Sequence, residues 1–79
     1  MIKITTLKEL YRVDNKYWKT GDTDILPKRH ELAMEIDNRL WSDLCGVVAI
    51  ATKHHRSVKE LAEALKILGY EVEEVDDGT

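Results

Sequence analysis

The stretch LCGVVAIATK, residues 44–53, is compatible with two structures, and the choice between them decides the fold class. Apolar residues recur at helical spacing through the preceding segment and into this one, which predicts a single helix over 28–53. They are Leu32, Ile36, Leu40, Leu44, Val47 or Val48, and Ala51. The β-branched run also suits a buried strand over 47–51, and Gly46 costs about 1 kcal/mol inside a helix. We expect the continuous helix and keep the strand as the alternative.

The segment nearer the N-terminus carries the signals of a first helix over 6–19. Thr6 and Glu9 have the spacing of a capping box, in which each side chain accepts a hydrogen bond from the backbone N–H of the other residue. Apolar and aromatic residues then recur at helical intervals, namely Leu7, Leu10, Tyr11, Val13, Tyr17 and Trp18. Gly21 can adopt the left-handed conformation that ends a helix.

A second capping box, Ser57 with Glu60, opens a helix over 58–68 that ends before Gly69. Pro27 marks the start of the long central helix, because its missing N–H would have no partner in a first turn. The sequence therefore predicts three helices joined by short polar turns.

The segment YEVEEV, residues 70–75, contains β-branched residues and begins with an apolar and polar alternation, which predicts a short strand. Its expected partner is IKI, residues 2–4. The predicted class is thus α+β, with a minor two-stranded sheet of 2–4 with 70–75 beside helices over 6–19, 28–53 and 58–68. If 47–51 is a strand instead, it forms a βαβ unit in which 47–51 and 70–75 are parallel.

The length of 79 residues leads us to expect a single domain, 1–79. The start, MIKITTLKEL, has no apolar run long enough for a signal peptide, and the longest apolar stretch, CGVVAIA, is too short to span a bilayer. Cys45 is the only cysteine, so no intrachain disulfide can form, and a reducing compartment fits this. We therefore expect a cytoplasmic protein with no membrane partner.

The segment KHHR, residues 53–56, raises the question of a metal or phosphate site, because imidazole binds metals and arginine pairs with phosphate. His54 and His55 are adjacent and would point in different directions, whereas zinc needs three or four converging ligands. Cys45 lies among apolar residues, where a thiol is usually part of the core. The sequence predicts a polar turn at 53–56, and no metal, cofactor or catalytic site.

Charge is divided unevenly along the chain, although the net charge is only −3. Residues 1–59 carry 11 basic and 8 acidic side chains, and residues 60–79 carry 1 and 7. An acidic end attracts a basic protein surface, and exposed tryptophans are frequent anchors of interfaces. The predicted partner-binding residues are therefore Glu71, Glu73, Glu74, Asp76, Asp77, Trp18 and Trp41.

The predicted function is that of a small non-enzymatic domain that binds a larger protein of unknown identity, or a second copy of itself. Regulators and inhibitors encoded by phages and mobile elements are often stand-alone domains of this size, so that class of function is expected. The alternative is a nucleic-acid-binding module that uses one basic face of the first helix. That face carries Lys8, Arg12, Lys16 and Lys19.

Overall fold

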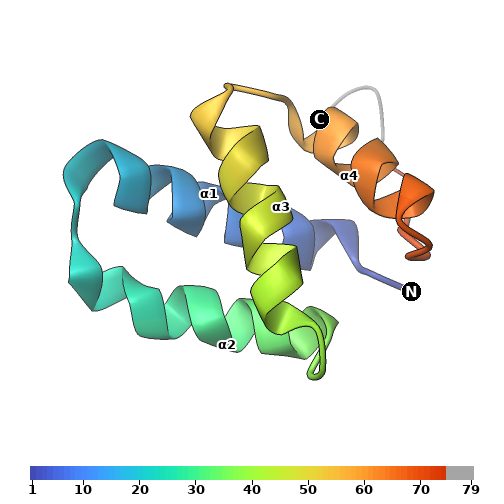
Figure 1. The fold of residues 1–79 in the computed structure, drawn as a ribbon, viewed down its shortest axis with the longest axis horizontal. Helices are drawn as coiled ribbons and strands as arrows, with labels where there is room; N and C mark the ends of the chain where they lie inside the picture. The colour runs from blue at the N-terminus through green and yellow to red at the C-terminus, as the bar shows by residue number, and fades with distance from the viewer. Residues whose placement is uncertain (75–79) are drawn as a thin grey trace.

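The structure is a computed structural model that describes residues 1–74, and Figure 1 shows its arrangement. It contains the helices α1 (Ile4–Thr20), α2 (Leu26–Ile36), α3 (Trp41–Lys53) and α4 (Val58–Ile67), with a short 3-10 helix, η1 (Thr23–Ile25), before α2. α1 and α2 lie side by side, α3 lies across both, and α4 packs against α3 and α1. No strand is present between residues 1 and 74. The predicted α+β class and its βαβ alternative are therefore both wrong, because this part of the chain is all-helical.

α1 supplies one wall of the core through its buried residues Leu7, Leu10 and Val13. The helix begins at Ile4, two residues earlier than the sequence predicts. Thr6 therefore lies inside the helix and does not cap it, and Glu9 pairs with Arg12 instead. Gly21 ends the helix with a φ of 69°, a backbone conformation that glycine adopts without steric cost.

The predicted continuous helix over 28–53 is wrong, because the chain turns between α2 and α3. Asp37 is extended there, with φ −149° and ψ 102°. Its Oδ1 accepts hydrogen bonds from the backbone N–H groups of Arg39 and Leu40, each at 3.0 Å. This side chain offers the amides a partner other than the helical ladder, so the helix stops. The apolar spacing continues across the turn, but Leu40 itself is exposed.

The predicted alternative of a strand over 47–51 is also wrong, since these residues form the middle of α3. The helix directs Leu44, Val48 and Ala51 into the core. Gly46 is exposed, and an added Cβ there would meet no atom within 4 Å. The glycine therefore lowers helix propensity without disturbing the packing. Burial of one face of α3 outweighs the strand preference of its β-branched residues.

α3 and α4 form a helical hairpin whose turn begins at the end of α3. His55 has a φ of 54°, an uncommon conformation for a residue other than glycine. Its N–H donates to the Thr52 carbonyl at 3.2 Å, and the Arg56 N–H donates to the Ala51 carbonyl at 2.8 Å. These two bonds are those of a Schellman motif, which pairs the last helical carbonyls. The Tyr11 hydroxyl donates to the Arg56 carbonyl and connects the turn to α1.

The start of α4 can be tested by replacing Ser57 with alanine. The Ser57 hydroxyl oxygen accepts a hydrogen bond of 3.1 Å from the Glu60 N–H. Because Ser57→Ala leaves that N–H without its acceptor, we expect the free energy of unfolding to fall by about 0.5 to 2 kcal/mol. Urea denaturation followed by circular dichroism measures the change. Ser42→Ala, at an exposed position inside α3, is the control; equal midpoints for the two variants would mean that the cap does not stabilise α4.

The predicted sheet of 2–4 with 70–75 is wrong, because the two segments meet in a single parallel bridge between Ile2 and Val72. The bridge consists of two backbone hydrogen bonds made by Ile2, of 2.7 and 2.9 Å. α1 begins at Ile4, and the extended Lys3 before it already accepts the Leu7 N–H of the helix at its carbonyl, so pairing stops there. The side chains of Ile2 and Val72 are buried, which fastens both segments to the core. Residue 75 lies outside the described residues.

Candidate protein-binding groove

The outer side of the α3–α4 hairpin carries aliphatic side chains that the other described helices leave uncovered. Four of them are half or more exposed, namely Leu40 at 51%, Ile50 at 62%, Ile67 at 86% and Leu68 at 60%. Leu40 lies just before α3 and Ile50 within it, while Ile67 is the last residue of α4 and Leu68 follows it. Clusters of exposed apolar residues on a small protein mark interaction surfaces more often than isolated ones do.

Two hollows follow this face. The first has a volume of about 280 Å³ and is lined by Val47, Ile50, Ala51, Arg56, Glu60, Leu61 and Ala64. The second has a volume of about 360 Å³ and is lined by Asp37, Leu40, Asp43, Leu68, Gly69 and Tyr70. Asp43 and Val47 are one helical turn apart, as are Ala64 and Leu68, so the hollows lie in line along the same two helices. We call the two hollows, together with Ile67 at their edge, the α3–α4 groove.

Small side chains line the middle of the groove, as Ala51 and Gly69 do at its two ends. Val47 and Ala64, which lie between the two ends, are smaller than Leu40, Ile50 and Leu68, which flank them. The ten-residue interval from Leu40 to Ile50 corresponds to about 15 Å at the helical rise of 1.5 Å per residue. The surface is therefore a concave apolar trough rather than a flat patch.

Ionised groups around the groove are placed unevenly. At the first hollow, Arg56 and Glu60 form an ion pair of 3.5 Å. At the second hollow, neither Asp37 nor Asp43 forms an ion pair with any basic group of residues 1–74. The exposed Glu71 directly follows the residues that line this second hollow. Two carboxylates, Asp37 and Asp43, thus line the second hollow where α3 begins, and the positive charge of Arg39 acts on Asp37.

Hydrogen bonds hold the pKa of Asp37 below its ordinary value. The largest contribution comes from the Leu40 N–H, the next from the Arg39 N–H, and the Tyr70 hydroxyl also donates at 3.1 Å. The pKa of Tyr70 is raised, chiefly because burial disfavours the phenolate and also because its hydroxyl donates to Asp37. The Asp37 carboxylate thus fastens the turn before α3 to the segment after α4, and so fixes the shape of the second hollow.

This carboxylate makes part of the stability depend on pH. Since the pKa of Asp37 is lower in the folded state, its contribution is present above the unfolded pKa of about 4 and is lost as pH falls through the folded value. We expect Asp37→Asn to lower the urea midpoint at about pH 7, and the difference from the parent to narrow as the pH falls below about 4. Asp24→Asn, in η1, is the control. A gap that stays constant with pH would mean that the charge of Asp37 does not contribute.

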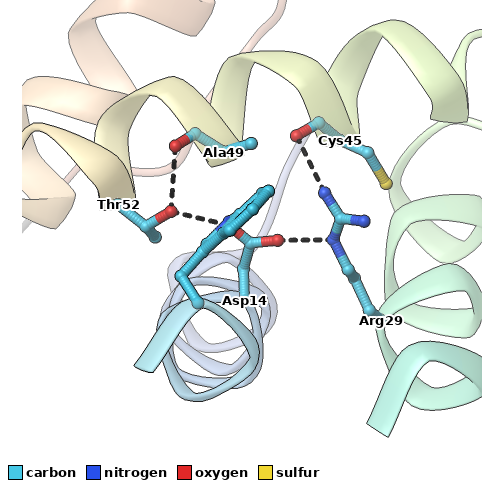
Figure 2. A network of polar contacts seen from close by, with 6 residues as sticks. Asp14, Arg29, Cys45, Ala49 and Thr52 are labelled. Atoms are coloured by element: carbon cyan, nitrogen blue, oxygen red, sulfur yellow. Dashed lines mark hydrogen bonds and ion pairs between the residues drawn. The ribbon is translucent and has the colours of Figure 1, made fainter. Parts of the chain in front are cut away.

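A buried polar network on the core side of α3 holds the hairpin against α1 and α2, as Figure 2 shows. Asp14 on α1 is fully buried and forms an ion pair with Arg29 on α2. The other carboxylate oxygen of Asp14 accepts hydrogen bonds from the Thr52 hydroxyl at 2.7 Å and from the Trp18 indole N–H at 3.0 Å. Arg29 also lies 3.4 Å from the Cys45 carbonyl oxygen, to which it donates. One carboxylate therefore connects three helices.

The polar network around Asp14 has the features of a structural contact and not those of a reactive site. The Asp14 carboxylate is engaged by donors at both oxygens and has no exposed surface for a substrate. Burial raises the pKa of the neighbouring Cys45 thiol, which makes it a poorer nucleophile. Across residues 1–74, no three His, Cys, Asp or Glu side chains gather in a way that could hold a metal ion. His54 and His55 lie exposed in the hairpin turn.

The two tryptophans predicted to bind a partner lie apart and do not line the groove. Trp18 is 42% exposed at the end of α1, and the Lys53 ammonium lies 4.0 Å above its ring. Trp41 is partly buried at the start of α3, with its ring 4.2 Å from that of His30 between centroids. Both rings are therefore already engaged within the chain.

The charged residues predicted as partner sites fall on two separate surfaces. Glu71, Glu73 and Glu74 are exposed, while Asp76 and Asp77 lie outside the described residues. The basic residues of the alternative prediction lie on α1, where Lys8 is half-buried and Arg12, Lys16 and Lys19 are exposed. Of these charged residues, only Glu71 directly follows a residue that lines the groove, Tyr70.

Sequence reasoning missed the aliphatic residues of the groove. A signal was present at Ile67 and Leu68, because consecutive apolar residues at the end of an amphipathic helix cannot both face the core.

No helix within residues 1–74 has the length and apolar character needed to cross a membrane. Comparison of the chain with protein-family models, with curated proteins and with solved structures finds no match.

Proposed function

We propose that the chain is a non-enzymatic domain that binds a larger protein through the α3–α4 groove. The observation that carries the proposal is the concave apolar surface itself, with four aliphatic side chains half or more exposed around two hollows. Burial of apolar surface is the main driving force of protein association, and a preformed concave surface loses little conformational freedom on binding.

The acidic residues beside the groove support a partner with basic groups. Glu71, Glu73 and Glu74 are exposed, Glu71 directly follows Tyr70 of the second hollow, and Asp76 and Asp77 come later in the sequence. Charges at the rim of an interface act mainly by accelerating encounter with an oppositely charged surface. The proposed role is that of a regulator or inhibitor that occupies a surface of its partner, as the stand-alone proteins of phages and mobile elements do.

A cytoplasmic location belongs to the same proposal. Cys45 is a buried free thiol without a disulfide partner, which suits a reducing compartment. A second copy of the chain is the other candidate partner. A measurement of the oligomeric state distinguishes self-association from binding to a different protein.

Nucleic-acid binding by α1 is the second candidate function. Three exposed basic side chains on one helix, Arg12, Lys16 and Lys19, favour it. Arg12 is paired with Glu9, which reduces the charge that this face offers to phosphates. The net charge of −3 also opposes non-specific attraction to nucleic acid.

An affinity pull-down from the native host, with and without nuclease, tests the proposal. We expect capture of a host protein that does not depend on nuclease treatment. Replacement of Lys8, Arg12 and Lys16 by glutamate should leave this capture unchanged, whereas Leu68→Asp should abolish it. Neutralising Glu71, Glu73 and Glu74 should slow the association of this protein, and the effect should shrink as salt rises. Capture of nucleic acid alone, abolished by the α1 replacements and steeply dependent on salt, would establish the second candidate instead.

A further inference from the structure

We infer that the occupant of the α3–α4 groove is an amphipathic α-helix of about three turns with a basic residue at one end. This inference rests on the proposed function and specifies the partner that the groove accepts. Three observations carry it: the length of the apolar floor, its concave profile, and the Asp43 carboxylate at one end, which forms no ion pair with any group of residues 1–74.

The length of the floor matches a short helix. The lining residues run from Leu40, just before α3, to Ile50, an interval of ten residues that corresponds to about 15 Å or roughly three helical turns. A helix of this length presents apolar side chains at positions i, i+3 or i+4, and i+7, which would fill the two hollows in succession.

The profile of the floor favours a helix over a second copy of the same hairpin. The groove is hollow at both ends and has the small residues Val47 and Ala64 at its middle, so a convex ridge can enter it. Two copies placed face to face would oppose hollow to hollow and leave both unfilled. Apolar hollows that stay unfilled forfeit the contacts that stabilise an interface.

The charges specify one end of the helix. Arg56 is neutralised by Glu60 at the first hollow, whereas Asp43 at the second hollow is exposed and has no cationic partner among residues 1–74. Asp37 lines the same hollow, with the positive charge of Arg39 acting on it, and Glu71 directly follows Tyr70 of this hollow. A lysine or arginine of the bound helix would find its partner there, so charge complementarity sets the direction in which the helix lies.

The test uses a displayed library of 14-residue peptides on an alanine-rich helical frame. Apolar residues at i, i+3, i+7 and i+10 are varied among Leu, Ile, Met and Phe, and both ends are varied among Lys, Gln and Glu. The baits are the parent chain, Asp43→Lys, and Glu31→Lys as the control at an exposed acidic position of α2. Affinities of selected peptides are then measured with each bait.

We expect selected peptides to become helical on binding and to carry lysine at one end. Exchange of that lysine for glutamate should weaken binding by about two- to fivefold, and the Asp43→Lys bait should prefer glutamate at the same end. The Glu31→Lys bait should behave as the parent. Equal binding to an Ile50→Asp chain, the absence of any charge preference, or peptides that bind in an extended form would each overturn the inference.

Failure of the inference differs from failure of the proposed function. If no helical peptide is selected but Leu68→Asp still abolishes capture of a host protein, the groove binds a protein of another shape. If sedimentation shows that the chain self-associates and that Ile50→Asp abolishes this, a second copy is the occupant. If neither peptides nor host proteins depend on the groove, the proposed function is also wrong.

Discussion

Replacement of Asp14 by alanine is expected to lower the free energy of unfolding by about 3 to 5 kcal/mol. Asp14 has no exposed surface, and its carboxylate serves Arg29, Thr52 and Trp18 at once. Without it, the partly buried Arg29 guanidinium keeps only the Cys45 carbonyl, at 3.4 Å. A chain of this size has a total stability of about 4 to 12 kcal/mol, so the variant should be close to unfolding at room temperature.

Urea denaturation of Asp14→Ala measures this loss, and Glu9→Ala provides the control. Glu9 is also a carboxylate of α1 that pairs with an arginine, but its pair with Arg12 is exposed to solvent, so its removal should have little effect. The double variant Asp14→Leu with Arg29→Met removes both charges and should recover most of the stability. Equal stability of Asp14→Ala and Glu9→Ala would contradict the role assigned to the buried carboxylate.

Ile50→Asp is expected to weaken binding of the captured partner by about tenfold or more while leaving the fold intact. Ile50 is 62% exposed, so its replacement removes little buried surface and should change the free energy of unfolding by no more than about 0.5 kcal/mol. In the complex the same position would be covered, and a carboxylate there would lose its hydration without gaining a partner.

Met34→Asp is the matched control for this variant. Met34 is an exposed apolar residue of α2 that does not line the groove, so the same chemical change should not affect binding. Titration calorimetry or surface-based kinetics with the captured partner compares the two variants. Equal losses of affinity in both would mean that the partner responds to the added charge rather than to the groove.

The helices with local start and stop signals could be predicted from the sequence. The helix over 58–68 appears as α4, because the Ser57 cap and the turn at Gly69 are both formed by neighbouring residues. The break after α2 was missed because apolar spacing was weighed above the turn-forming pair Asp37 and Asn38. The decisive contact there is an Asp37 side chain that accepts two backbone N–H groups, and Asp and Asn are frequent in such turns.

The prediction of a two-stranded sheet is wrong because strand pairing depends on the tertiary structure. The alternation after Gly69 is typical of a strand, but a strand needs a partner, and the start of α1 at Ile4 leaves only Ile2 for pairing. The strand prediction for 47–51 failed because α1, α2 and α4 all pack on α3, and a helix buries that apolar run among them.

The groove could not be located from the sequence because exposure depends on which helix faces are covered. Ile50 and Val48 are similar in chemistry and two residues apart, yet Val48 is fully buried and Ile50 is not. Glu71, Glu73 and Glu74 were predicted from charge alone, and the structure adds that they are exposed and that Glu71 follows Tyr70 of the second hollow. The tryptophans were chosen as frequent interface residues, but their contacts lie within the chain.

Methyl NMR of the isoleucine side chains tests most directly whether the α3–α4 groove is the binding surface. Ile50 lines the groove and Ile67 is exposed on α4, whereas Ile2 is buried in the core and Ile4, Ile25 and Ile36 pack against it. On addition of the protein captured in the pull-down, we expect the Ile50 and Ile67 signals to shift or broaden, with the other four little changed. Unchanged Ile50 and Ile67 signals in a saturated complex, with shifts confined to α1 or α2, would contradict the proposed function.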